Sequence, residues 1–156
     1  VLETWTGSIT HMGDVGMGHK MKLMMNFISM SYAALYSEAV VLGAKVGISP
    51  AQLREVIAPS RMGCGFFDTF MNYVVDRNRD AHKFAIANAS KDLRYVNAMA
   101  TDAGVVNVMA SAARHYFTHV EALGAAQDYV PMLSDHVGRL NGLDMDAVTK
   151  EGQDAD

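Results

Sequence analysis

Two polar residues lie inside the most apolar stretch of the chain, at a spacing that could support proton transfer. Lys22 and Asn26 are four residues apart, which places them one turn apart on one face of a helix. Their neighbours are methionine, leucine, phenylalanine and isoleucine. An amine in such surroundings loses hydration, which lowers its pKa, so we expect more of Lys22 than of an ordinary lysine to be in the neutral form that can accept a proton. The alternative is a lysine that extends to solvent near a helix start, with a core asparagine bonded to backbone.

One long helix must carry this pair. Glycines at 13, 16 and 18 precede it, and a run without Gly or Pro then continues to Gly43 and Gly47. This pattern predicts a loop that leads into a single long helix, with other helices wrapped round it. At ~1.5 Å per residue, about thirty residues would span roughly 45 Å.

Shorter helices are predicted to follow, and the sequence contains no repeat or hairpin signal. The clearest start is at Ser49, Pro50 and Gln52, which together form a capping box with proline at the first helical position. We therefore predict an all-α fold, a long central helix wrapped by about five shorter helices. The first of the shorter helices is predicted to end near residue 58. The others are predicted to cover 65–75, 84–103, 107–123 and part of 128–140.

Composition limits the classes of function. The chain has 156 residues, 50% of them hydrophobic and 19% charged, which suits one ordinary domain with a proper core. The net charge is -4 and no basic block is present, so nucleic acid is not expected as a partner. Cys64 is the one cysteine, so no internal disulfide can form, and a cytoplasmic location is expected.

The pattern of polar residues favours neither a membrane-spanning protein nor a metal-binding one. Asn26, Ser29 and Glu38 interrupt the long apolar run, so we do not expect it to span a membrane. His115 and His119 are four apart on a predicted helix, but no third ligand is evident, so no metal site is predicted.

A resemblance to a known family adds to this interpretation. The motifs are Gly16-x-Gly18-x-x-x-Lys22-x-x-x-Asn26, then Glu38-Ala39, then Phe84 followed after six residues by Lys91-Asp92-Leu93. In this order and at this separation they resemble the C-terminal half of the β-hydroxyacid dehydrogenases. That family includes 3-hydroxyisobutyrate dehydrogenase and tartronate semialdehyde reductase and is more distantly related to 6-phosphogluconate dehydrogenase. The resemblance runs from about residue 13 to about residue 137.

The resemblance implies a role for each motif residue. Lys22 would be the catalytic lysine, which accepts the proton of the substrate hydroxyl and returns it in the reverse reaction. Asn26 would bind the substrate hydroxyl or carboxylate, and Gly18 would let the backbone approach the substrate. Cofactor-binding residues would be Lys91, Phe84 and Asp92. Core packing for Phe84 and a surface ion pair for Asp92 remain alternatives.

The resemblance also implies that a cofactor domain is absent. Gly13, Gly16 and Gly18 do not match the G-x-G-x-x-G spacing that binds NAD phosphates. Residues 1–15, with a possible strand near 8–10, would be a remnant of the junction with a Rossmann domain. Residues 16–145 would form the substrate and dimerisation domain, and 146–156 a disordered tail.

Two functions from different classes follow from these observations. The first is the helical domain of an NAD(P)-dependent 3-hydroxyacid dehydrogenase that acts on a small 3-hydroxy acid, with NAD or NADP bound mainly by the absent domain. Without that domain, we expect the chain alone to be inactive. The second is a stand-alone helical dimerisation or interaction module without catalysis. A homodimer or higher homo-oligomer is expected in both cases, because the long helix is apolar on nearly all sides.

Overall fold

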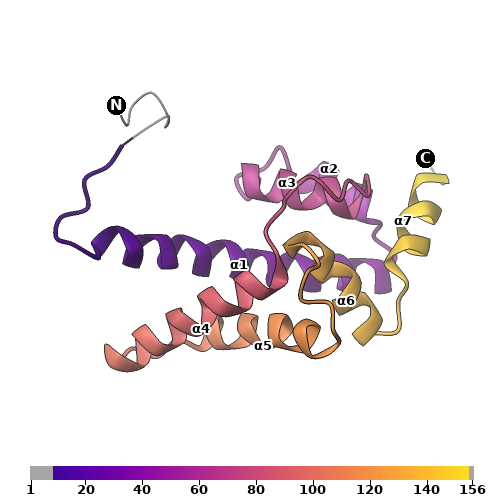
Figure 1. Cartoon of the computed structure of the whole chain (residues 1–156). Coiled ribbons are helices and arrows are strands. Elements are labelled where there is room, and N and C mark those ends of the chain that lie inside the picture. Colours follow the sequence, from indigo (N-terminus) through magenta and orange to yellow (C-terminus); the bar gives the residue numbers. More distant parts are fainter. Residues whose placement is uncertain (1–8, 155–156) are drawn as a thin grey trace.

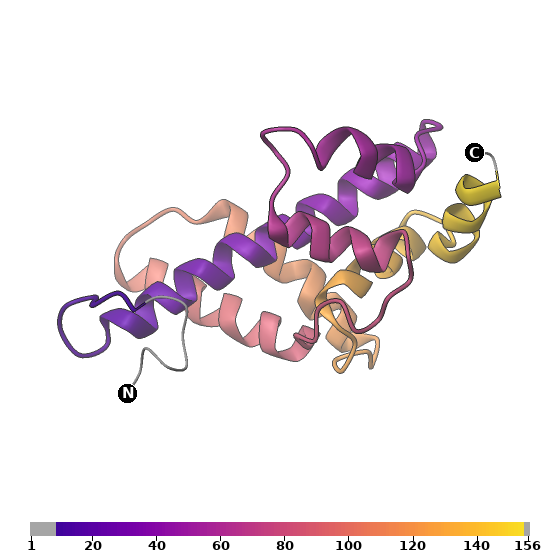
Figure 2. The same cartoon turned by 90° about the horizontal axis from the view of Figure 1, so that it is seen from above.

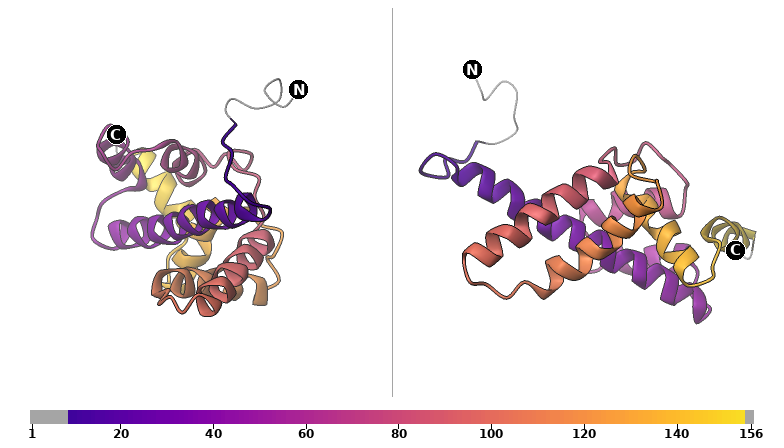
Figure 3. Two further views of the ribbon diagram at one scale, coloured as in Figure 1. Left: turned by 90° about the vertical axis from the view of Figure 1, so that its left-hand side faces the viewer. Right: turned by 60° about the horizontal axis from the view of Figure 1, so that its bottom comes forward.

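One long helix, α1 (Met17–Lys45), runs through the middle of the molecule (Figure 1). The computed structural model describes residues 9–154. Two shorter helices, α2 and α3, lie over the C-terminal half of α1, and α4, α5 and α6 lie along its other side (Figures 1 and 2). The view along α1 in Figure 3 shows it between these two groups. The shorter elements are α2 Pro50–Ile57, α3 Gly65–Val74, α4 Ile86–Asp102, α5 Val108–Ala122, the 3₁₀ helix η2 Val130–Met132, α6 Leu133–Leu140 and α7 Met145–Asp154.

The predicted all-α class with one long helix is confirmed. None of the residues from 9 to 154 lies in a strand, and Ala85 and Tyr129 form an isolated antiparallel bridge. Part of the strand expected near residues 8–10 falls outside the described residues, while Ile9 and Thr10 are exposed and irregular. Within residues 9–154, six α-helices follow α1, where about five were expected, because residues 145–154 also form a helix.

Glycines set both ends of α1. Gly16 precedes the helix with a φ of 94°, a left-handed conformation that glycine adopts without steric cost. After Lys45 the chain turns through Gly47, whose φ is 87°. The next helix then starts as predicted, since the Ser49 side chain accepts from the Gln52 backbone and the Gln52 side chain accepts from the Ser49 backbone.

Helix α4 begins two residues later than the sequence suggested. Phe84 and Ala85 instead run beside the segment before η2, where the Val130 N–H donates to the Phe84 carbonyl at 2.9 Å. The Ile86 N–H donates to the Asp128 carbonyl at 2.8 Å. These bonds between distant segments hold the start of α4, so Phe84 precedes the helix.

The core lies where α1 meets α3, α4, α5 and α6. Its largest fully buried side chains include the aromatic residues of α3 and α5, namely Phe67, Phe70 and Phe117. A second, smaller cluster of Leu23, Val96 and Ala110 lies nearer the start of α1. Burial of these two clusters fixes α4 and α5 against α1.

The C-terminal segment differs from the expected disordered tail. Met145 is 2% exposed, and the Thr149 hydroxyl donates to the Val74 carbonyl at 3.1 Å and the Met145 carbonyl at 2.8 Å. Arg77 also pairs with Asp146 at 2.7 Å. The sparse apolar residues of this segment therefore suffice to dock α7.

The length and hydropathy of α1 also meet the criterion for a membrane span, with a mean hydropathy of 1.3. The core helix of a soluble protein meets the same criterion.

Candidate functional site

Lys22 and Asn26 converge on one buried carboxylate. Lys22 Nζ lies 2.6 Å from Asp92 Oδ2, and Asn26 Nδ2 donates to the same oxygen at 2.5 Å. The side chain of Asp92 is 3% exposed, whereas that of Lys22 is 49% exposed. The three side chains therefore form one cluster, with the carboxylate inside and the ammonium group at the surface.

Helix geometry explains this meeting. Lys22 and Asn26 lie one turn apart on α1, and Asp92 lies in the second turn of α4, which packs against α1. Two residues on the same face of α4, Leu93 and Val96, are buried in the two apolar clusters. Their burial holds the face of α4 that carries Asp92 against α1.

The cluster determines the charge of Asp92. Burial alone would raise the pKa of its carboxyl group. The hydrogen bonds from Lys22 and Asn26, with the positive charges of Lys22 and Lys91, outweigh burial, so the pKa lies below its ordinary value. Asp92 is consequently an anion at neutral pH.

The expectation of a dehydrated lysine is not met. Lys22 is half-exposed, and it is an ammonium group paired with a carboxylate. Asn26 likewise donates to a side chain and not to the backbone. Asp92 also differs from the surface ion pair considered as an alternative, because it is buried and its two hydrogen-bond donors, Lys22 and Asn26, are on another helix.

The other predicted site residues lie at different distances from this cluster. Lys91 is adjacent: its Nζ is 3.7 Å from Asp92 Oδ1, and its side chain is 44% exposed. Phe84 precedes α4 and packs partly buried against the main core. Gly18 lies one turn before Lys22, where it is exposed, and a Cβ there would meet nothing within 4 Å.

The sequence interpretation missed a histidine between two aromatic rings. The His82 ring centroid lies 5.5 Å from that of Phe66 and 6.2 Å from that of Phe84. Burial lowers the pKa of His82, and its Nδ1 is buried without a hydrogen-bond partner. No spacing in the sequence signals this contact, because His82 is in a loop and its partner Phe66 is in α3. The burial of Asp92, by contrast, could have been predicted from the sequence. Ala89, Asp92, Leu93 and Val96 follow helical periodicity and therefore lie on one face of the helix.

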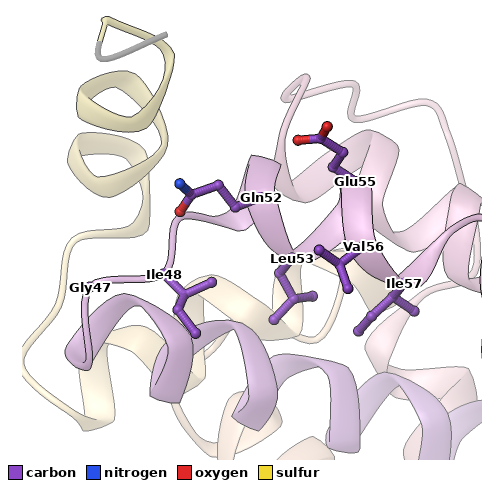
Figure 4. A pocket seen from close by; sticks show the side chains of 7 residues that line it. All are labelled: Gly47, Ile48, Gln52, Leu53, Glu55, Val56 and Ile57. Carbon is purple, nitrogen blue, oxygen red and sulfur yellow. The ribbon is translucent and has the colours of Figure 1, made fainter.

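Two of the surface hollows lie near opposite ends of α1. A hollow of about 790 Å³ lies beside α2 at the C-terminal end, far from Lys22 (Figure 4). Leu53 and Ile57 point toward α1 there, while Gln52 and Glu55 point away. A smaller apolar hollow of about 260 Å³ lies nearer the cluster and is lined by side chains that include Met24, Phe27 and Val96.

Comparison with known proteins gives the family of this helical domain. Residues 16–134 match the family described as NAD-binding of NADP-dependent 3-hydroxyisobutyrate dehydrogenase. The chain belongs to this family.

Curated relatives are hydroxyacid dehydrogenases and semialdehyde reductases. The chain is 29% identical over 116 residues to glyoxylate/succinic semialdehyde reductase 1 of Arabidopsis thaliana, covering 73% of the chain and 39% of the relative. It is 27% identical over 128 residues to 2-(hydroxymethyl)glutarate dehydrogenase of Eubacterium barkeri, covering 82% and 42%. The chain thus spans about two fifths of the length of these relatives.

Solved structures show the same fold. A 3-hydroxyisobutyrate dehydrogenase from Salmonella typhimurium superposes with a TM-score of 0.79 at 22% identity, over 86% of this chain and 47% of that one. The 3-hydroxyisobutyrate dehydrogenase of Mycobacterium tuberculosis gives a TM-score of 0.75 at 23% identity, over 87% and 48%.

Proposed function

We propose that this chain is the helical domain of an NAD(P)-dependent 3-hydroxyacid dehydrogenase, in which Lys22 exchanges a proton with the substrate hydroxyl. The observation that carries the proposal is the convergence of Lys22 and Asn26 on the buried Asp92. A lysine tied to a rigid anion but half-exposed is held in place while still able to meet a ligand. The names of the relatives support the reaction class.

The chemistry requires a proton at the substrate oxygen. A bound nicotinamide cofactor supplies or accepts the hydride at carbon. In the reductive direction the Lys22 ammonium group gives its proton to the carbonyl oxygen, and in the oxidative direction the neutral amine takes it back from the hydroxyl. One Asn26 N–H is engaged by Asp92, so its amide oxygen and second N–H remain to orient the substrate.

The role of Asp92 is revised from a cofactor contact to a positioning residue. Its side chain is 3% exposed and one of its oxygens already accepts two hydrogen bonds. Lys91 keeps the proposed cofactor role: its contact with Asp92 is long at 3.7 Å, and its side chain is 44% exposed, which fits an ammonium group free to meet a polar group of the cofactor. Phe84 is proposed to line the same cleft and Gly18 to allow close approach of the substrate.

The proposal includes a second domain. The matching residues cover only 39% and 42% of the two relatives, and we propose that a Rossmann domain upstream binds most of the NAD or NADP and determines which is used. The substrate is a small 3-hydroxy acid and the working form is a homodimer. The 156-residue chain alone is expected to show no turnover.

The first test is the coding sequence upstream of Val1. An in-frame strand, G-x-G-x-x-G loop and helix supports the dehydrogenase. A natural protein without such a unit supports instead a stand-alone helical interaction module.

The second test is kinetic, on the protein that contains both domains. With NADH or NADPH and a panel of small 3-hydroxy acids and their semialdehydes, Lys22→Met is expected to lower kcat about 10²–10⁴-fold with cofactor affinity unchanged. The matched control is Lys20→Met, an exposed lysine two residues away on α1. Full activity of Lys22→Met, or turnover by the 156-residue chain alone, would contradict the proposal.

A further inference from the structure

A hollow of about 510 Å³ lies where three helices meet, away from the candidate site. Its lining residues come from α1, from α5, and from α6 with the residue that follows it, and these three helices pack against one another (Figure 1). Glu38 lines this hollow, about 24 Å along α1 from Lys22. Glu38 belongs to the sequence motifs described above, and the proposed function assigns it no part.

Two opposite charges of α1 line the hollow. Glu38 and Lys45 lie two turns apart on one face of the helix, about 10 Å along its axis, and both are exposed. This spacing is too long for the direct pair that residues three or four apart can form. The ion pairs found among residues 9–154 include neither side chain. Both charges are therefore available to a ligand.

The surface between these charges is apolar. Val41 and Leu42 lie on the intervening turn of α1, and Val137 of α6 lines the same hollow. Val41 and Val137 are buried, whereas Leu42 is 65% exposed. The hollow thus offers a negative group, an apolar surface and a positive group in a row.

Hydrogen bonds hold two acceptor groups at the negative end. The Tyr116 hydroxyl donates to Glu38 Oε1 at 2.6 Å, and this bond, aided by burial, raises the pKa of Tyr116 to about 12, so the phenol keeps its proton at neutral pH. Asn141 Nδ2 donates to the Val137 carbonyl at 2.9 Å. Glu38 Oε2 and Asn141 Oδ1 take no part in these bonds and can accept from a ligand.

We propose that this hollow binds a small α-amino acid, with its ammonium group on Glu38 and Asn141 and its carboxylate on Lys45. The two charged groups of an α-amino acid are about 3 Å apart, and a charge-assisted hydrogen bond at each end adds about 2.8 Å. The charged ends of Glu38 and Lys45 must then lie about 8–9 Å apart, which the ~10 Å between their backbones allows because both side chains are flexible. This site does not rest on the proposed function.

The paired charges also disfavour other small ligands. A phosphate or a simple carboxylate that approaches Lys45 gains nothing from Glu38, and a simple amine or a metal cation gains nothing from Lys45. A ligand with both charges satisfies both ends, and an apolar side chain on it can contact Leu42 and Val137. An amino acid with an apolar side chain is therefore the best probe.

Titration of the 156-residue chain with L-leucine, followed by amide NMR chemical shifts, tests the site. A saturable change with a Kd on the order of 1 mM is expected, with the shifts gathered in residues 35–45 and 137–141 and at Tyr116. The analogues 3-methylbutylamine and 4-methylpentanoate each lack one charge and are expected to bind at least about tenfold more weakly. Absence of saturation, shifts gathered elsewhere, or an analogue that binds as tightly as L-leucine overturns the proposal.

Substitutions test the two ends separately. Glu38→Gln removes the charge but keeps an oxygen that can accept from Tyr116, and Lys45→Met removes the opposite charge; each is expected to weaken L-leucine binding at least about tenfold. The matched controls are Glu55→Gln on α2 and Lys20→Met near the other end of α1, because both residues are exposed and lie outside this hollow. Both controls are expected to leave the Kd unchanged.

The outcomes separate a site from general charge effects. Unchanged affinity in either Glu38→Gln or Lys45→Met, or equal weakening in the matched controls, overturns the proposal. The NMR spectrum of each variant also shows whether it is folded, and the two analogues decide the question on the parent chain if a variant is not.

Discussion

Replacing Lys22 with methionine is expected to destabilise the chain more than replacing Asp92 with asparagine, although each change breaks the same ion pair. The Asp92 side chain is 3% exposed and that of Lys22 is 49% exposed. Lys22→Met therefore leaves a buried carboxylate without its nearest cation. Asp92→Asn leaves an ammonium group that water can solvate.

The magnitude follows from the partners that remain. Loss of one member of a buried ion pair costs about 3–5 kcal/mol. In Lys22→Met, Asn26 still donates to Asp92 and Lys91 lies 3.7 Å away, so we expect about 2–3 kcal/mol. In Asp92→Asn the lost bond has a half-exposed donor, and we expect about 1 kcal/mol.

Urea unfolding followed by circular dichroism measures both costs. The double variant is expected to lose about as much free energy of unfolding as Asp92→Asn alone, because it contains no buried charge. Lys20→Met is the matched control and is expected to change stability by less than about 0.5 kcal/mol. Equal costs for the two single variants, or the reverse order, would refute the reasoning.

The pH dependence supplies a second measure of the same effect. Asp92 has a lowered pKa in the folded chain, so its contribution to stability is fully present above about pH 4 and is lost as the pH falls through the folded pKa. Without Lys22, burial dominates and the pKa of Asp92 rises. The stability difference between the parent chain and Lys22→Met should therefore shrink between about pH 7 and pH 4. A constant difference would contradict this account.

Three further predictions concern the scaffold. Gly63→Ala is expected to lower the free energy of unfolding by more than about 2 kcal/mol, because a Cβ there would overlap a backbone carbonyl. Gly18→Ala, with open space around the new Cβ, should raise it by up to about 0.5 kcal/mol. Urea unfolding measures both changes. Thr149→Val should cost about 1 kcal/mol and expose α7 to limited proteolysis, because Thr149 is buried and bonded to α3; unchanged proteolysis would argue against that anchor. A hydrogen bond to Glu38, aided by burial, raises the pKa of Tyr116 to about 12, so the stability that this bond contributes is present below about pH 10 and lost as the pH rises through 12. Tyr116→Phe should remove one phenolate transition near that pH from an absorbance titration.

Local patterns were sufficient to predict most elements of the fold. The length of the run between Gly18 and Gly43 predicts α1, and the capping box at Ser49 predicts α2, because both signals are local to the backbone they describe. The start of α4 could not be predicted in this way. Phe84 lies outside the helix because of bonds to Val130, far along the chain.

The sequence could indicate which residues belong to the candidate site, but not how these residues contact one another. The sequence indicates Lys22, Asn26, Lys91 and Asp92 as candidates, largely through a resemblance. It does not indicate that Asp92 is the buried partner of Lys22, because the packing of α4 against α1 buries the carboxylate and brings it to Lys22.

By itself the sequence determined the helical class, the long helix and the fact that Lys22 and Asn26 lie on one side of it, since helical periodicity depends only on residue spacing. The tertiary structure alone decided that Lys22 is half-exposed and that Asp92 is its buried partner. It also decided which apolar row of α1 became core, with Met30, Ala33 and Val40, and which remained exposed, with Met25, Leu35 and Leu42. Both rows are apolar enough to be buried, and only the helices that pack against α1 distinguish them.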